Sequence, residues 1–90
     1  MNTKESIPSI KLYGAKRCHK TQFYLSFLNE TGLPYDFLDV EINKDHVEEL
    51  RGLYLNRKLN FPTLTIGSKK LSNPRKEDLE KWLNKLILKD

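Results

Sequence analysis

The sequence predicts an α/β domain in which a four-stranded mixed sheet is flanked by three helices, in the order β-α-β-α-β-β-α. Short segments rich in strand-forming residues alternate with longer segments whose apolar residues recur at helical spacing. Glycine and proline stand at the joins between these segments. Ninety residues suffice for one hydrophobic core, so we expect residues 1–90 to form a single domain.

The first half of the chain predicts a strand, a helix and a second strand. Ile7–Tyr13 alternates apolar and polar residues toward its end, and Gly14 opens a loop that leads to a helix from about His19 to about Thr31. Gly32 is placed to end that helix as its C′ residue. Tyr35–Val40 follows as the second strand, and a crossover of this length makes the two strands parallel.

A second helix is expected to begin near Asn43 and Asp45, which are both helix-capping residue types. Asp45 with Glu48 three residues later fits a capping box. Gly52 weakens a helix by roughly 1 kcal/mol relative to alanine, so the second half of this helix is expected to be the less stable one. The buried stripe of the helix is predicted to consist of Val47, Leu50, Leu53 and Tyr54.

The last third of the chain predicts a β-hairpin and a helix. Asn60–Ile66 is expected to open a strand with Pro62 near its start, and Gly67-Ser68 is a two-residue turn to an antiparallel strand at Lys69–Leu71. Ser72-Asn73-Pro74 then predicts a helix start with the proline at the first helical position. The core face of this helix is predicted to contain Leu79, Trp82, Leu83, Leu86 and Ile87.

Cys18 is the candidate functional residue, and it is the only cysteine in the sequence. A thiol reacts as the thiolate, which is favoured at a helix N-terminus and beside cations. Lys16, Arg17 and Lys20 all lie within two residues of Cys18. A single cysteine is also often a small buried hydrophobic residue without chemistry. Both interpretations stay open here, and the charged neighbours favour the reactive thiol.

Composition and charge exclude several other functions. The 16 Lys and Arg residues exceed the 12 Asp and Glu residues, giving a formal charge of +4, but outside the Cys18 loop the basic residues occur as dispersed pairs. We therefore expect no nucleic-acid partner. The sequence has no apolar run that spans a bilayer and no signal-peptide pattern, so we expect a cytoplasmic protein without a membrane partner. Cys18, His19 and His46 lack the paired spacing of a metal site, so no metal is expected.

Together these features resemble the glutaredoxin-like proteins of the thioredoxin fold. The resemblance covers nearly the whole chain and rests on the cysteine after the first strand, on Phe61-Pro62-Thr63 before the hairpin and on the order of elements. It implies that Pro62 is cis and faces Cys18, and that the backbone of Phe61 and Thr63 helps to hold an extended substrate. Leu71-Ser72-Asn73-Pro74 is similar to the Thr-Asn-Pro segment of mycoredoxin-type glutaredoxins, which reduce mixed disulfides with small thiols.

The activity implied by this resemblance is thiol-disulfide exchange by one cysteine. Thr21 stands where many glutaredoxins have a resolving cysteine, and its hydroxyl either donates to the Cys18 thiolate or caps the first helical turn. The implied co-substrate is glutathione or another low-molecular-weight thiol, with no bound cofactor. The implied partners are oxidised or thiolated proteins, and we expect a monomer. Candidates for binding the small thiol are Lys16, Arg17 and Lys20, for which a solvated surface role is also open, and Asn73, for which plain capping of the last helix is the alternative.

Two other functions fit the same residues. The first is a non-enzymatic adaptor or redox sensor that keeps the fold and becomes thiolated at Cys18 without turnover. The second is a monothiol iron-sulfur carrier, in which Cys18 and the small thiol hold a cluster between two copies of the chain. The sequence lacks the Cys-Gly-Phe-Ser motif of iron-sulfur glutaredoxins and has Cys18-His19-Lys20-Thr21 in its place.

Overall fold

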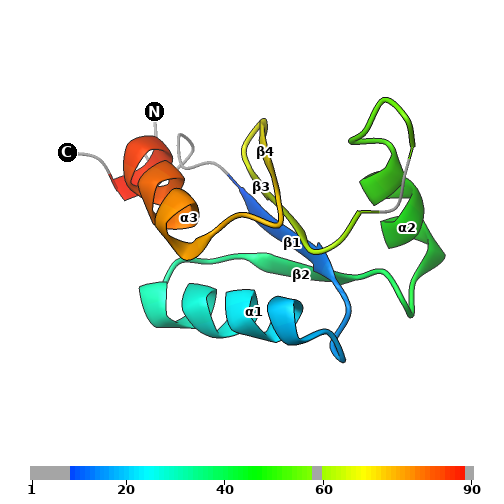
Figure 1. Cartoon of the computed structure of the whole chain (residues 1–90), viewed down its shortest axis with the longest axis horizontal. Helices are drawn as coiled ribbons and strands as arrows, with labels where there is room; N and C mark the ends of the chain where they lie inside the picture. The colour runs from blue at the N-terminus through cyan, green and yellow to red at the C-terminus, as the bar shows by residue number, and fades with distance from the viewer. Residues whose placement is uncertain (1–8, 58–59, 89–90) are drawn as a thin grey trace, which may run out of the picture.

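The computed structural model describes residues 9–57 and 60–88, and it contains one four-stranded sheet in the order β2-β1-β3-β4 (Figure 1). The strands are β1 (Ile10–Gly14), β2 (Asp36–Asp39), β3 (Thr63–Ile66) and β4 (Lys69–Ser72). β1 runs parallel to β2 and antiparallel to β3, and β3 runs antiparallel to β4. The sheet is therefore mixed, as the sequence predicts.

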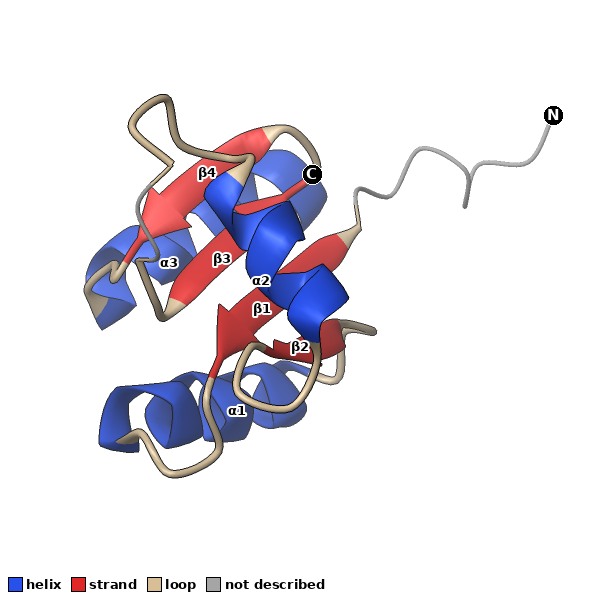
Figure 2. Ribbon diagram, turned by 90° about the vertical axis from the view of Figure 1, so that its right-hand side faces the viewer, coloured by secondary structure: helices blue, strands red, loops and turns tan. Residues whose placement is uncertain are grey.

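Helices cover both faces of this sheet. They are α1 (His19–Thr31), α2 (Lys44–Arg51) and α3 (Lys76–Leu83), and α3 continues into a π-helical segment, η2 (Asn84–Leu88). Figure 2 shows α2 in front of the sheet and α3 behind it. This arrangement confirms the predicted fold class. Within the described residues, none of these helices has the length and apolar character that crossing a membrane requires.

The alternation of side chains along the strands explains the two layers. One face carries the larger core, which packs against α1 and α3, and the other face carries a smaller core against α2. The larger core contains Ile10, Leu12, Tyr24, Leu28, Leu64, Ile66, Leu71, Leu79 and Leu83. The smaller core contains Tyr13, Val40 and Leu50. β1 lies between these cores, so the loop that follows it leaves from a well-anchored strand.

The bounds of α1 agree with the prediction, including its termination. Gly32 adopts the left-handed conformation with φ 75°, and its N–H donates to the carbonyl of Asn29 at 3.2 Å. An L-residue with a Cβ is disfavoured in this conformation, which is why glycine ends helices in this way. The glycine signal therefore located the end of α1 correctly.

The cap of α2 differs from the predicted capping box. Asn43 is the N-cap residue, and its side-chain oxygen accepts a hydrogen bond from the N–H of Asp45 at 2.8 Å. Asp45 is already the second helical residue, and Glu48 instead accepts from Arg57 at 3.0 Å. The capping box on Asp45 and Glu48 is therefore wrong, because a cap two residues upstream satisfies the first turn.

This cap can be tested by substitution. Asn43→Ala is expected to lower the free energy of unfolding by about 1 kcal/mol, because the first turn of α2 loses its side-chain acceptor. Urea denaturation measures the change, and Asp45→Ala serves as the comparison. A larger loss for Asp45→Ala than for Asn43→Ala would contradict the assignment of Asn43 as the cap.

The start of α3 also differs from the prediction. The helix begins at Lys76, and its N-cap, Arg75, has extended backbone and no side-chain capping bond. Asn73 has a positive φ of 51°, and its N–H donates to the carbonyl of Pro62 at 3.0 Å. This long-range bond holds the chain in a turn, so Pro74 lies before the helix and not at its first position. Both the predicted proline position and the capping role of Asn73 are wrong.

The predicted core face of the last helix is confirmed, and Leu86 and Ile87, which lie in η2, are partly buried against the larger core. Leu79 and Leu83 are buried, whereas Trp82 is half-buried and packs against the margin of the larger core. The ammonium groups of Lys69 and Lys85 lie 4.1 and 5.2 Å from the centroid of the Trp82 ring, a cation–π arrangement. Trp82 thus closes the core at the surface.

Candidate active site

Cys18 occupies the N-cap position of α1. Its backbone is extended (φ −85°, ψ 124°), its N–H donates to the carbonyl of Ala15 at 3.0 Å, and its carbonyl accepts from the N–H of Gln22 at 3.0 Å. These bonds fix the residue where the β1–α1 loop becomes helix. The thiol is free and partly exposed. The predicted position of Cys18 at the leading end of the helix is confirmed.

The N-terminus of α1 lowers the pKa of the Cys18 thiol. The largest contribution is the backbone N–H of Thr21, followed among the stabilising groups by the Thr21 hydroxyl, the N–H of Lys20 and the charge of Lys20. Partial burial opposes these effects but does not cancel them. The thiol forms no side-chain capping bond, but the N–H groups of the first turn are orphan donors that stabilise an anion at this position. Cys18 is therefore poised to ionise more readily than an ordinary cysteine.

Thr21 is fully buried and fixes the β1–α1 loop through its side chain. Its Oγ1 accepts from the N–H of Ala15 at 3.3 Å, and Gly14 packs so closely that a Cβ there would lie 2.4 Å from that oxygen. Since the hydroxyl accepts from the loop, its own proton remains to be donated toward the Cys18 thiolate. This arrangement favours the thiolate-donor role over simple capping of the first turn.

The role of the hydroxyl is testable by an isosteric change. Thr21→Val is expected to raise the pKa of Cys18, because valine keeps the shape but cannot donate a hydrogen bond to the thiolate. Thr21→Ser keeps the hydroxyl and is expected to leave the pKa close to that of the wild-type protein. Ultraviolet absorbance of the thiolate during a pH titration measures both. Equal pKa values in the valine and serine variants would contradict the assigned role.

The three cations beside Cys18 have different surroundings. Arg17 forms a bidentate pair with the Glu41 carboxylate, with Nε contacts of 3.0 and 2.7 Å, and this pair is the main reason that the pKa of Arg17 is raised. Lys20 contributes its charge to the lowered pKa of Cys18. Lys16 is exposed, and its carbonyl accepts from the side chain of Gln22 at 2.5 Å. Arg17 and Lys20 therefore both interact electrostatically with the thiol, but the guanidinium of Arg17 is also paired with Glu41.

The Phe61–Thr63 segment lies at the same end of the sheet as the C-terminal end of β1, from which the Cys18 loop starts. Tyr13 near the end of β1 is paired with Thr63 at the start of β3, and the Phe61–Pro62 peptide bond is cis. The Pro62 carbonyl accepts from Asn73, and the Thr63 hydroxyl donates to the carbonyl of Asn60 at 2.8 Å. Thr63 is fully buried between two strands, whereas Phe61 is 36% exposed. Phe61 is therefore the member of this segment most open to a partner.

A cavity of about 370 Å³ lies between the start of α1 and the start of α3. It begins next to Cys18, because His19 and Lys20 form part of its wall. Of the residues predicted to bind a small thiol, the cavity includes Lys20 and Asn73. The complete lining is His19, Lys20, Phe23, Tyr24, Asn73, Pro74, Arg75 and Lys76.

Comparison with known proteins gives matches among solved structures. No protein-family model matches the chain, and no curated protein matches it. A mutant of the thioredoxin-like protein BC3987 superposes with a TM-score of 0.72 at 24% identity, covering 84% of this chain and all of that one. A glutaredoxin from Archaeoglobus fulgidus superposes with a TM-score of 0.69 at 17% identity, covering 97% of this chain and 95% of that one.

The chain has a thioredoxin-like fold. Identities this low establish the fold and leave the activity to be argued from the site. In this thioredoxin-like fold, the thiol lies beyond the carboxyl end of β1, which is the edge where ligands bind in open α/β sheets.

Sequence reasoning missed two features of this thioredoxin-like site. Tyr24 was not assigned to the site from the sequence, but its hydroxyl donates to the carbonyl of Pro74 and lies 3.4 Å from Asn73 Oδ1. The tendency of buried tyrosines to find a hydrogen-bond partner is the signal that pointed to such a contact. Arg75 and Lys76 were likewise not assigned to the site, because only the tertiary fold brings them to α1.

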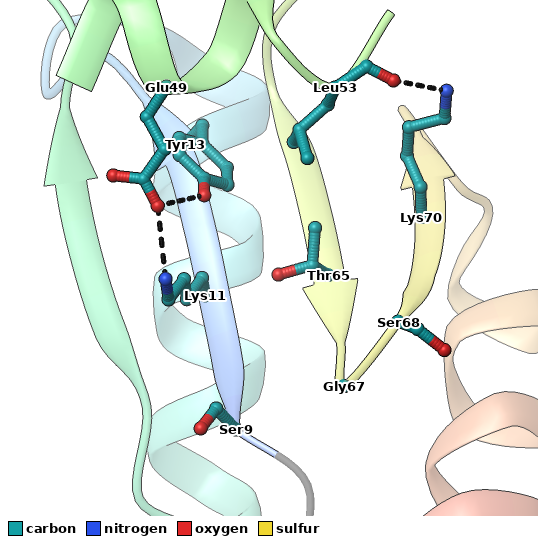
Figure 3. Close-up of a pocket in the computed structure, with 9 residues that line it drawn as sticks. All are labelled: Ser9, Lys11, Tyr13, Glu49, Leu53, Thr65, Gly67, Ser68 and Lys70. Atoms are coloured by element: carbon teal, nitrogen blue, oxygen red, sulfur yellow. Dashed lines mark hydrogen bonds and ion pairs between the residues drawn. The ribbon is translucent and has the colours of Figure 1, made fainter.

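A second cavity, of about 390 Å³, lies on the sheet face that α2 partly covers (Figure 3). The Glu49 carboxylate there accepts from Tyr13 at 2.7 Å and from Lys11 at 3.0 Å, and Lys70 donates to the carbonyl of Leu53 at 2.8 Å. These polar groups are hydrogen-bonded to one another, and the lining of this cavity includes neither Cys18 nor His19 and Lys20, the residues next to Cys18 that line the first cavity. Within the described segments, no three histidine, cysteine, aspartate or glutamate side chains gather as a metal site requires. The candidate active site is therefore the Cys18 edge.

Proposed function

We propose that the protein is a glutaredoxin-like thiol-disulfide oxidoreductase that reduces mixed disulfides between proteins and a small thiol by a monothiol mechanism. The observation that carries this proposal is the position of Cys18 at the N-terminus of α1, where the Thr21 and Lys20 N–H groups lower the pKa of the thiol. The thioredoxin-like fold supports a thiol-redox role in general terms. Because the chain has one cysteine, the exchange proceeds without an intramolecular disulfide.

The chemistry takes two exchange steps. In the first, the Cys18 thiolate attacks the small-thiol sulfur of a protein mixed disulfide, so that a Cys18–small-thiol disulfide forms and the protein thiolate leaves and is protonated. In the second, the thiolate of another small-thiol molecule attacks that sulfur, forms the small-thiol disulfide and releases Cys18 as a thiolate. Overall, one free small-thiol molecule is consumed: the protein thiol is regenerated, and that small thiol leaves joined in a disulfide to the one that was attached to the protein.

A stabilised thiolate at Cys18 serves both steps. In the first step it keeps a larger fraction of the nucleophile ionised near neutral pH, and in the second step Cys18 is the leaving group, which departs faster when its pKa is low. Lys20 and Asn73, in the wall of the cavity, are suited to hold the small thiol. Phe61, exposed at the same sheet edge, is suited to contact the protein part of the substrate.

The proposal is tested with a glutathionylated protein, glutathione and a coupled glutathione-reductase assay. We expect catalytic release of the protein thiol, and intact-mass spectrometry should detect a transient glutathione adduct on the chain, which can only be at Cys18. An adduct that accumulates without turnover would instead support the sensor function. Absence of both adduct and turnover with glutathione and with the other small thiols named below would overturn the proposal.

A further inference from the structure

The cavity beside Cys18 has an unusually one-sided charge. Its wall contains three permanent cations, Lys20, Arg75 and Lys76, together with His19, and no lining residue is acidic. The remaining lining is aromatic or uncharged. The nearest acidic residues along α3, Glu77 and Asp78, are exposed and do not line the cavity. A ligand in this cavity is therefore surrounded by positive charge. A cationic group on the ligand finds no acidic side chain in the lining.

Within the described residues, the three cavity cations form no ion pair with a carboxylate. In the part of the chain that the structure describes, the ion pairs are Lys11–Glu49, Arg17–Glu41 and Arg57–Glu48. None of these includes Lys20, Arg75 or Lys76. An anion that enters the cavity can therefore interact with these cations without first breaking an ion pair within the protein. At a surface where the cations are already paired, breaking such a pair would offset part of the binding energy.

Two helix N-termini add to the positive electrostatic potential of the cavity. α1 begins at His19 and α3 at Lys76, and both residues line the cavity. Neither helix has a side-chain capping bond, since Cys18 and Arg75 stand at the two N-cap positions without one. The N–H groups of both first turns carry partial positive charge, and in α1 those of Lys20 and Thr21 also stabilise the Cys18 thiolate. Helix ends and cations together therefore favour more than one negative charge on the ligand.

We propose that the small thiol used by Cys18 is a polyanion, carrying phosphate groups or several carboxylates and no ammonium group. This inference rests on the proposed function and specifies its co-substrate. Phosphates and carboxylates suit the Arg75, Lys76 and Lys20 wall, because charge-assisted bonds to these side chains are the strong ones. Phe23, 45% exposed, and Tyr24 supply an apolar wall for the uncharged part of the molecule. A thiol that carries an ammonium group finds no acidic residue in this lining.

The test compares mixed disulfides of one peptide with four thiols of different charge. The thiols are cysteamine, a cation; glutathione, which carries an ammonium group and two carboxylates; mercaptosuccinate, a dicarboxylate; and coenzyme A, a phosphorylated thiol. At low ionic strength we expect coenzyme A or mercaptosuccinate to react about tenfold faster than glutathione, and cysteamine to be slowest, with the differences shrinking as salt rises. A preference for coenzyme A alone identifies phosphate as the group recognised, and a shared preference identifies carboxylates as sufficient.

A pair of charge-matched variants separates the cavity from the net charge of the protein. R75Q/K76Q removes two cavity cations, and K44Q/K81Q removes two exposed lysines that are not in the lining. We expect R75Q/K76Q to abolish most of the roughly tenfold preference and K44Q/K81Q to retain it. An equal loss in both variants would overturn the inference, because the preference would then reflect overall charge.

The two proposals fail in different ways. Equal rates for all four thiols would overturn the polyanion inference and leave the oxidoreductase proposal standing. Binding of desulfo-coenzyme A and of succinate to the Cys18→Ser protein, measured by calorimetry, tests the cavity without any exchange chemistry. Binding of either that R75Q/K76Q weakens and K44Q/K81Q does not supports the inference, and no binding of either at low salt contradicts it.

Discussion

Replacing Cys18 with serine is expected to slow mixed-disulfide reduction by at least about 10³-fold, because the serine hydroxyl stays protonated and forms no disulfide. The chain offers no second cysteine to take over the reaction. The coupled assay with a glutathionylated protein measures this loss directly. Residual activity within about tenfold of the wild-type rate would contradict a nucleophilic role for Cys18.

The same variant carries its own control for folding. Serine is a preferred N-cap residue, and position 18 is the N-cap of α1, where the cysteine makes no capping bond. We therefore expect the Cys18→Ser protein to be at least as stable as the wild-type protein in urea denaturation. A loss of activity with unchanged or higher stability assigns the effect to chemistry.

Gly14→Ala is expected to destabilise the protein by about 1–3 kcal/mol, the range for inserting a methyl group into a packed core. The new Cβ would lie 2.4 Å from Oγ1 and 2.9 Å from Cγ2 of Thr21. Both residues are buried, so neither has solvent to move into. Thr21 also accepts a hydrogen bond from the N–H of Ala15, so displacing Thr21 is expected to disturb the loop that carries Cys18. Thiol reactivity and stability should fall together.

A double-mutant comparison isolates this contact. In a Thr21→Ala background, Oγ1 and Cγ2 are gone, so the added cost of Gly14→Ala should be clearly smaller than in the wild-type protein. Gly52→Ala is the matched control, because a Cβ there meets nothing closer than 3.5 Å and the residue has ordinary αR backbone. We expect Gly52→Ala to be neutral or mildly stabilising. Similar costs at both glycines would contradict the steric explanation.

Local signals were sufficient for the fold and for the position of the thiol. The helical spacing after Cys18, the αL glycine at Gly32 and the turn at Gly67 depend on residues close together in sequence, and the structure has each feature where it was predicted. The cis peptide before Pro62 was implied by the resemblance to glutaredoxins and is present. These features define the frame of the site.

The features that could not be predicted from the sequence depend on contacts between residues that are far apart in the chain. Local rules placed Pro74 at the first position of α3, but the bond from Asn73 N–H to the Pro62 carbonyl delays the helix. Tyr24 and Pro74 are 50 residues apart, and no local pattern indicates that one will donate to the other. The charge of the cavity has the same origin, since Lys20 and Arg75 become neighbours only when α3 packs near α1.

The central claim is that the N-terminus of α1 activates Cys18, and the pH dependence of its alkylation tests that claim most directly. We predict a single titration with an apparent pKa below the ordinary thiol value of about 8.5, because the Thr21 and Lys20 N–H groups stabilise the thiolate. The reaction rate should therefore remain high at neutral pH and fall only under more acidic conditions. A slow reaction that titrates at or above about 8.5 would contradict the account and leave a thioredoxin-like fold without an activated thiol.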